Sequence, residues 1–309
     1  MPRTHTFSRA PLLGTTVEVQ VAARSKTART VADAVLAEIV RLEHVCSRFV
    51  PDSELERWKR GEVARPGTDL TEVLRRVHAL QVGSGGAYNP CAGAIVERWR
   101  AAEATGVPPT DDELAHLAAA IARPRFVVDP VPRPVDDCTA LDLHALGKGW
   151  IVDRALGAGL AAVDAAPDLL VVNAGGDLRH AGTVPVRAEV ADPVQRDQRA
   201  APVAVIPLRD AAIATSGRAR QGFVVGDVRH SHVLDPRTGR PVDHLASISV
   251  VAPDAVTADG LATVLGVEPV DRALALADAH GVACLVVDRA GRLHANPAWS
   301  DLAGAVTTG

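Results

Sequence analysis

Leu169-Leu-Val-Val-Asn173-Ala-Gly-Gly-Asp177 is the stretch that decides the fold. Its apolar residues predict a buried strand, and the glycine pair behind Asn173 predicts a tight turn. Strand-like segments follow at 203–206, which Pro207 is expected to end, and at 248–252, which Pro253 is expected to end. The last segments, 282–288 and 292–294, flank an Arg-Ala-Gly turn and predict a closing hairpin. The second half of the chain therefore supplies several strands of a sheet.

Helical spacing of apolar residues predicts helices between these strands. A strand at 17–21 precedes an amphipathic helix at 27–46, and further helices are expected at 70–80, 254–264 and 270–279. Thr110-Asp-Asp-Glu113 has the pattern of a capping box that starts one more helix. Because strands and helices mix without a regular βαβ order, the sequence predicts a single α+β domain over residues 1–309, with mixed or antiparallel sheets and packed helices.

Composition excludes several classes of protein. The net charge is -4 and aromatic residues make up 3% of the chain, which argues against a nucleic-acid partner. The four cysteines are scattered without a C-x-x-C pair, so we expect buried thiols and no zinc site or disulfide framework. No run is long enough to span a membrane, and the opening residues contain no apolar signal segment. These features predict a soluble, cytoplasmic protein.

Asp259 and Thr263 are four residues apart in the predicted helix at 254–264. This spacing places both side chains on one helix face, where a carboxylate and a hydroxyl suit a hard cation such as Mg²⁺. The same spacing is also typical of a surface aspartate beside a threonine whose hydroxyl bonds back to the preceding helical turn. Spacing alone does not choose between these interpretations.

Glycines flank Lys148 in Asp142-Leu-His-Ala-Leu-Gly-Lys-Gly149, ahead of an amphipathic helix. We interpret them as a turn whose backbone can approach a phosphate, with the lysine adding a charge. The alternative is a glycine turn with a solvated lysine. The stretch does not have the P-loop pattern. The glycine turn at 173–177 could also bind phosphate through its backbone N–H groups, but this pattern alone is weak evidence for a phosphate site. Thr215-Ser-Gly217 is expected to form a hydroxyl-rich turn.

His232-Val-Leu-Asp-Pro-Arg-Thr-Gly239 is the sharpest chemical signal in the chain. A strand is expected to carry His232 into a turn made by Asp235, Pro236 and Gly239. A histidine held rigidly in this way can transfer a proton near neutral pH. A lone histidine with a structural role is the alternative.

Together with other stretches, these motifs form one ordered pattern along nearly the whole chain. The additional stretches are Leu13-Gly-Thr-Thr-Val-Glu-Val, Ser47-Arg-Phe-Val-Pro-Asp-Ser-Glu-Leu55 and Gly85-Gly-Ala-Tyr-Asn-Pro90. The pattern resembles the ApbE family of flavin transferases, FAD:protein FMN transferases. The resemblance implies a single α+β domain that splits the diphosphate of FAD, passes the FMN phosphoryl group to a Thr or Ser hydroxyl of a target protein and releases AMP, with Mg²⁺ as the metal.

The resemblance also implies roles for individual residues. His232 matches the catalytic histidine. The metal position falls on the main-chain oxygen of Ala145 and on Asp259 and Thr263. The flavin-contacting positions fall on Leu13, Phe49, Ala87, Tyr88, Asn89, Asp142, Lys148 and Val233.

Several residues depart from the family pattern. Leu13 stands where methionine is usual, and His144 takes a usual glycine position. The other departures are Phe49 for tyrosine, Lys59 for asparagine, Asn89 for aspartate and Gly260 for alanine. They bear on FAD affinity and target choice more than on the metal position.

Three other functions stay open at the level of sequence. FAD hydrolysis to FMN and AMP uses water as the acceptor, and the acceptor is not encoded in this chain. A non-catalytic flavin-binding protein would hold the cofactor without releasing AMP. A structural or interaction domain would retain no flavin.

Overall fold

The computed structural model describes residues 3–136, 138–195, 201–217 and 222–304. Its main sheet is built from β1 (Thr4–Leu12), β2 (Thr15–Ala22), β5 (Leu169–Ala174), β6 (Asp177–Ala181), β9 (Ala212–Gly217), β12 (Leu245–Ala252), β13 (Ala283–Asp288) and β14 (Leu293–Ala295). Three two-stranded ribbons lie outside it: β3 (Phe126–Val127) with β4 (Arg133–Pro134), β7 (Val186–Val190) with β8 (Ala204–Leu208), and β10 (Gly222–Val225) with β11 (Val228–Ser231).

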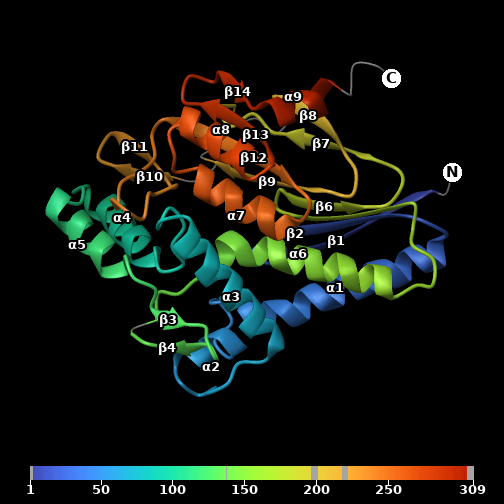
Figure 1. The fold of residues 1–309 in the computed structure, drawn as a ribbon, viewed down its shortest axis with the longest axis horizontal. Coiled ribbons are helices and arrows are strands. Elements are labelled where there is room, and N and C mark those ends of the chain that lie inside the picture. The colour runs from blue at the N-terminus through green and yellow to red at the C-terminus, as the bar shows by residue number, and fades with distance from the viewer. Residues whose placement is uncertain (1–2, 137, 196–200, 218–221, 305–309) are drawn as a thin grey trace.

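The main sheet has eight strands in the order β1-β2-β5-β6-β9-β12-β13-β14 (Figure 1). Every neighbouring pair in this order runs antiparallel. The predicted α+β class is confirmed, and among the described residues the sheets are antiparallel throughout, without a parallel pair.

Helices cover the sheet and extend beyond it. The helices are α1 (Ser25–Cys46), α2 (Glu54–Lys59), α3 (Thr68–Gly83), α4 (Gly93–Thr105), α5 (Asp111–Ile121), α6 (His144–Ala161), α7 (Ala255–Leu265), α8 (Val270–Ala279) and α9 (Pro297–Gly304). One face of the sheet packs against α1, α6 and α7, and the β7–β8 ribbon and α9 lie against the other (Figure 1). None of these helices, in the described part of the chain, has the length and apolar composition needed to cross a membrane.

The central strands are apolar because both faces of the sheet are covered. All eight residues of β12 are buried. Ile248 and Val250 point into the core beneath the helices, whereas Val251 points into the second core beneath β7–β8 and α9. Because the strand has no solvent-exposed face, its two serines, Ser247 and Ser249, are buried as well.

Most predicted elements are confirmed. The strand at 17–21 and the apolar run at 169–172 are the cores of β2 and β5, and the helices predicted at 27–46, 70–80 and 270–279 are α1, α3 and α8. The capping box at α5 is complete, with the Thr110 hydroxyl accepting from the Glu113 N–H and the Thr110 N–H donating to Glu113. The cysteines are buried as expected, and burial raises the pKa of both Cys46 and Cys284 to about 12.

Two predicted boundaries are wrong. Pro207 lies inside β8 instead of ending it. Among the described residues β8 pairs with β7 only, so the N–H that proline lacks is not needed for a second neighbouring strand. Thr215-Ser-Gly217 is the end of β9 and not a turn. Thr215 pairs with Ser249 of β12, and their hydroxyl oxygens are 2.8 Å apart.

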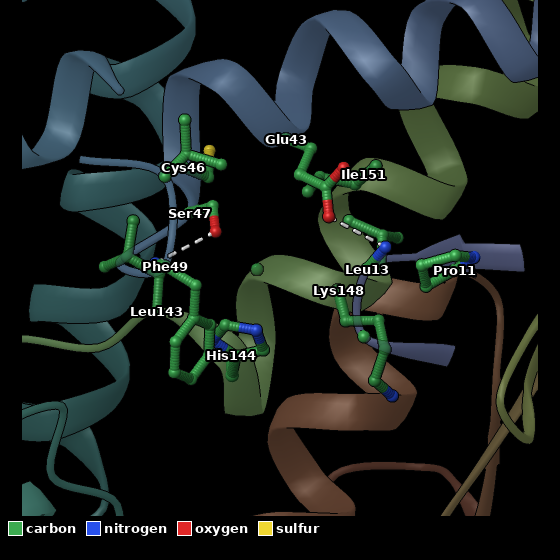
Figure 2. Close-up of a pocket in the computed structure, with 13 residues that line it drawn as sticks. Pro11, Leu13, Glu43, Cys46, Ser47, Phe49, Leu143, His144, Lys148 and Ile151 are labelled. Atoms are coloured by element: carbon green, nitrogen blue, oxygen red, sulfur yellow. Dashed lines mark hydrogen bonds between the residues drawn. The ribbon is translucent and has the colours of Figure 1, made fainter. Parts of the chain in front are cut away.

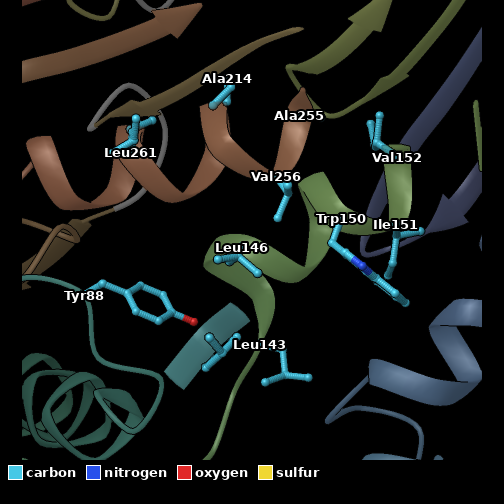
Figure 3. Packing of buried hydrophobic residues seen from close by; sticks show 14 of the residues in the cluster. Tyr88, Leu143, Leu146, Trp150, Ile151, Val152, Ala214, Ala255, Val256 and Leu261 are labelled. Carbon is cyan, nitrogen blue, oxygen red and sulfur yellow. The ribbon is translucent and has the colours of Figure 1, made fainter. Parts of the chain in front are cut away.

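The predicted glycine turn around Lys148 is also wrong, because α6 already begins at His144. Gly149 instead lets α6 approach α7: a Cβ atom added here would lie 2.3 Å from the carbonyl oxygen of Ala255. The Gly149 N–H donates to Asp259 Oδ2 at 3.1 Å. Asp153 of α6 accepts from the N–H groups of Ala255 and Val256, both at 2.9 Å, and so satisfies the first turn of α7. Figure 3 shows the apolar side chains around this contact.

We expect Gly149→Ala to lower the free energy of unfolding by about 1–3 kcal/mol, because the new methyl group would collide with the backbone of α7. Gly157→Ala is the matched control on the same helix, since a Cβ there meets nothing within 4 Å. Its effect should lie between neutral and about 1 kcal/mol of stabilisation from helix propensity. Urea unfolding of both variants measures the difference, and equal stabilities would contradict the assigned role of Gly149.

Candidate active site

Two cavities flank the first turn of α6. The first cavity has a volume of about 360 Å³ and lies between the β1–β2 turn, the end of α1 and α6 (Figure 2). The second cavity, of about 370 Å³, lies between the 87–90 loop, α4, the start of α6 and the 232–236 segment. Every site residue predicted from the sequence except Asp259 lines one of them. Leu13 and Lys148 line the first, Phe49 lines both, and the second is lined by Ala87, Tyr88, Asn89, Asp142, Ala145, His232, Val233 and Thr263.

Leu13 reaches the first cavity from a strained turn between β1 and β2. Its φ angle is +53° and that of the following Gly14 is +70°, so both residues adopt the left-handed conformation. For a leucine this conformation costs about 1–2 kcal/mol. The Leu13 N–H donates to Glu43 Oε1 at 2.9 Å, which holds the turn against α1 (Figure 2). Glu43 was not predicted, because it is a contact between segments distant in sequence.

Asp142 organises the residues around Phe49. Its carboxylate lies 2.5 Å from His144 Nδ1 and accepts from the His144 N–H at 2.9 Å. Arg48 lies 3.4 Å from the same carboxylate and 5.1 Å from the centre of the Phe49 ring. Burial raises the pKa of Asp142, but the hydrogen bonds and charge of His144, with the charge of Arg48, outweigh it, so the net shift is downward. Asp142 is therefore an ionised anchor for the side chains of Arg48 and His144.

The 87–90 loop forms one wall of the second cavity. Tyr88 is almost fully buried, and its hydroxyl has no hydrogen-bond partner among the described residues. Figure 3 shows this hydroxyl pointing toward the start of α6. Burial raises the pKa of Tyr88 well above its ordinary value, and the charges of Asp142 and Asp259 add to the shift. The phenol therefore stays neutral, with an unpaired O–H near two carboxylates.

Asp259, Thr263 and Ala145 lie where α7 crosses α6. The Thr263 hydroxyl lies 3.1 Å from the carbonyl oxygen of Asp259 and 3.4 Å from that of Ala145. The first contact is the back-bond considered as the alternative, and the second joins the two helices. Asp259 is 8% exposed. No group of three or more His, Cys, Asp or Glu side chains suited to a metal occurs in the described segments, so a cation here would rely on main-chain and hydroxyl oxygens as well.

Lys148 is an ion-paired side chain, so the solvated-lysine alternative is wrong. Its ammonium contacts the Asp177 carboxylate, which is 3% exposed. The glycine turn before Asp177 is confirmed, with Gly175 and Gly176 at positive φ. The Gly176 N–H donates to Asn173 Oδ1 at 3.0 Å, so this group is already used within the turn. The phosphate cradle suggested for this turn therefore lacks one of its donors.

His232 directly follows β11 and lines the second cavity with Thr263 and Ala145. The predicted turn behind it is confirmed: the Gly239 N–H donates to the Asp235 carbonyl at 2.8 Å. Trp99 of α4 fixes the turn further, since its indole N–H donates to the Gly239 carbonyl at 2.9 Å. The histidine is thus carried by a segment anchored at its far end.

The sequence and the fold agree with comparisons to known proteins. The ApbE family pattern matches residues 13–286. The chain belongs to the ApbE family. FAD:protein FMN transferase of Vibrio cholerae is 31% identical over 302 residues, covering 90% of this chain and 85% of that protein. The protein of the same name from Haemophilus influenzae is 29% identical, with 90% and 84% covered.

Solved ApbE structures share the fold. The ApbE protein of Thermotoga maritima superposes with a TM-score of 0.85 at 25% identity, covering 97% of this chain and 99% of that one. The flavin transferase ApbE from Vibrio cholerae gives a TM-score of 0.76 at 25% identity, covering 97% and 100%. The predicted family and the predicted fold are therefore both confirmed.

Asn89 departs from the ApbE pattern for a reason visible in its contacts. Its Nδ2 donates to the Ile121 carbonyl at 2.7 Å, and its Oδ1 accepts from the Cys91 N–H at 2.9 Å. The usual aspartate can accept but, when ionised, cannot donate. In this chain the amide ties the cavity wall to the end of α5.

Two more residues that differ from the ApbE pattern, Lys59 and Gly260, are also explained by their surroundings. The Lys59 side chain is 5% exposed, and its ammonium lies 2.6 Å from Glu56 and 3.4 Å from the carbonyl oxygen of Leu141, the residue before Asp142. At Gly260 the Cβ of the usual alanine would lie 3.0 Å from a methyl group of Leu80. Leu80 therefore occupies space that the pattern reserves for an alanine beside Asp259.

We expect Asn89→Asp to destabilise the protein by about 1–3 kcal/mol at pH 8, because two oxygens would then face each other at Ile121. Burial would raise the pKa of this Asp. Because a protonated carboxyl can donate to the Ile121 carbonyl, the loss of stability should shrink as pH falls toward 5. Asn173→Asp is the control, since Asn173 serves Gly176 as an acceptor only. Thermal unfolding at both pH values measures the effect, and a loss independent of pH would contradict this account.

Proposed function

We propose that this chain transfers the FMN phosphoryl moiety of FAD to a Thr or Ser hydroxyl of a target protein and releases AMP. The observation that carries the proposal is the convergence of residues from six distant segments on two adjoining cavities. The names of the relatives, FAD:protein FMN transferase, support the same reaction. Phosphoryl transfer depends mainly on positioning and charge neutralisation, which a rigid cavity wall of this kind can supply.

The oxygen atoms at the α6–α7 crossing fit Mg²⁺. Asp259, Thr263 and the carbonyl of Ala145 are hard donors, and a single carboxylate suits a Mg²⁺ ion that completes its coordination with substrate phosphates and water. The unpaired Tyr88 hydroxyl nearby is a further polar group that the protein leaves available. A bound Mg²⁺ would supply Lewis-acid stabilisation of charge on the diphosphate.

The other residues bind and orient the reactants. Lys148, held by Asp177, presents a charge-compensated ammonium to the first cavity. His232 lies on the wall of the second cavity, where its imidazole would accept the proton of the incoming hydroxyl. The turn at 235–239 limits its motion and keeps the ring at the cavity.

One assay separates this proposal from its alternatives. The protein is incubated with FAD and Mg²⁺, with and without a candidate acceptor protein, and the products are followed by mass spectrometry. The transferase predicts an acceptor heavier by one FMN moiety and AMP release that depends on the acceptor. Equal AMP release without an acceptor identifies a hydrolase, and FAD binding without AMP identifies a non-catalytic flavin-binding protein.

We expect His232→Asn to lower the rate of AMP release by about 10²–10⁴-fold, which is the typical contribution of a general base. FAD affinity should change little, because asparagine keeps a polar side chain of similar reach at the cavity wall. His116→Ala is the control, since His116 is an exposed residue of α5. Turnover within threefold of wild type would refute the role of His232.

We expect Asp259→Asn to abolish the stimulation of turnover by Mg²⁺. The amide oxygen can still accept from the Gly149 N–H, so the helix contact is kept while the charge is lost. Thr263→Ser, which preserves a hydroxyl, should retain most of the stimulation. Titration of Mg²⁺ against AMP release provides the measurement, and an unchanged Mg²⁺ dependence in Asp259→Asn would count against the metal site.

A further inference from the structure

Phe49 and His144 are the two described residues that line both cavities. Their ring centroids are 5.4 Å apart and the rings meet edge to face at 67°. Figure 2 shows the two rings next to each other, with Leu13 and Lys148 on the far side of the first cavity. The aromatic pair is therefore the boundary between the two cavities.

A dinucleotide bound at this site has to cross that boundary. The positions implied for FAD are divided between the cavities: Leu13 and Lys148 belong to the first, whereas Tyr88, Asp142 and Val233 belong to the second. A single FAD molecule can occupy both cavities only if it passes the aromatic pair. A side chain on that boundary therefore contacts the ligand even when the family pattern assigns it no role.

The pair also offers the surface that a planar ring system needs. Phe49 is 70% exposed, and it is the aromatic residue among the exposed large hydrophobic side chains of the described part of the chain. The His144 side chain is 39% exposed. Aromatic rings contact one another in offset-stacked or edge-to-face arrangements, so this pair offers one ring for stacking and one for an edge contact. An exposed phenylalanine in a cavity mouth is thus a contact surface for the isoalloxazine or adenine ring.

The ring of His144 is held in place from behind. Asp142 binds its Nδ1 at 2.5 Å and its backbone N–H at 2.9 Å. Arg48 lies between the same carboxylate and the Phe49 ring. This arrangement fixes the imidazole before a ligand arrives, so little conformational entropy is lost on binding.

A purely structural role does not account for the His144 side chain. It stands at the first residue of α6, it contributes nothing to the buried core, and the family pattern has a side-chain-free glycine at this position. The fold is therefore built without it in relatives that follow the pattern. What the imidazole adds in this chain is a second ring beside Phe49 at the cavity boundary.

We propose that His144 is a ligand-binding residue that, together with Phe49, stacks against one ring system of FAD as the dinucleotide passes between the two cavities. This inference rests on the proposed function, because FAD is the ligand. It adds a specificity-determining contact that a glycine at position 144 cannot make.

The test measures FAD affinity in the His232→Asn background with Mg²⁺ present, so that FAD is not consumed. Flavin fluorescence quenching gives Kd for the parent and for variants carrying His144→Ala, His144→Phe or the control His116→Ala. We expect His144→Ala to raise Kd by about two- to tenfold, as the loss of one aromatic contact implies. His144→Phe, which keeps a ring, should stay within about twofold, and His116→Ala should match the parent.

FMN and AMP, the two halves of the ligand, are titrated in parallel. Contact with one ring predicts that His144→Ala weakens the binding of either FMN or AMP and leaves the binding of the other unchanged. An unchanged FAD Kd in His144→Ala, or equal weakening of both halves, would overturn the inference. If the parent binds FAD and His144→Ala binds it equally well, the proposed function survives and this inference fails; if the parent binds no FAD, both fail.

Discussion

The contact between α6 and α7 at Gly149 is the constraint on which the site depends. Ala145 and Lys148 come from α6 and Asp259 and Thr263 come from α7, more than a hundred residues later. They meet because Gly149 has no side chain and because Asp153 satisfies the first N–H groups of α7. Any residue larger than glycine would separate the helices and with them the three residues proposed to hold the metal. A packing requirement and a chemical requirement therefore coincide in one residue.

The remaining walls of the site are attached to this helix pair by a few polar contacts. The Asp142 N–H donates to the Pro90 carbonyl at 2.8 Å, which joins the 87–90 loop to the start of α6. Asn89 fixes the same loop to α5, and Glu43 fixes the β1–β2 turn to α1. Each contact joins elements distant in sequence, so the two cavities are assembled by tertiary structure and not by any single motif. Such pre-organisation suits phosphoryl transfer, where geometry contributes more than covalent chemistry.

Periodicity predicted the elements whose burial follows a simple pattern. The buried faces of α1 and α3 and the apolar runs of β5 and β12 carry this signal in their own residues. The start of α6 was missed because Gly147 and Gly149 are poor helix formers, and tertiary packing overrides that propensity. Spacing placed Asp259 and Thr263 on one helix face, and the family resemblance supplied Ala145, which no local pattern connects to them. The contacts of Glu43, Arg48 and His144 could not be predicted, because each depends on a neighbour far along the chain.

The exposed ring of Phe49 has a thermodynamic consequence. An aromatic surface that is 70% exposed keeps a shell of hydration water in the free protein. Any ligand that covers it releases this water, and removal of apolar surface from water lowers the heat capacity of the system. Association at this cavity boundary therefore has a negative heat-capacity change, and its enthalpy becomes more favourable as temperature rises.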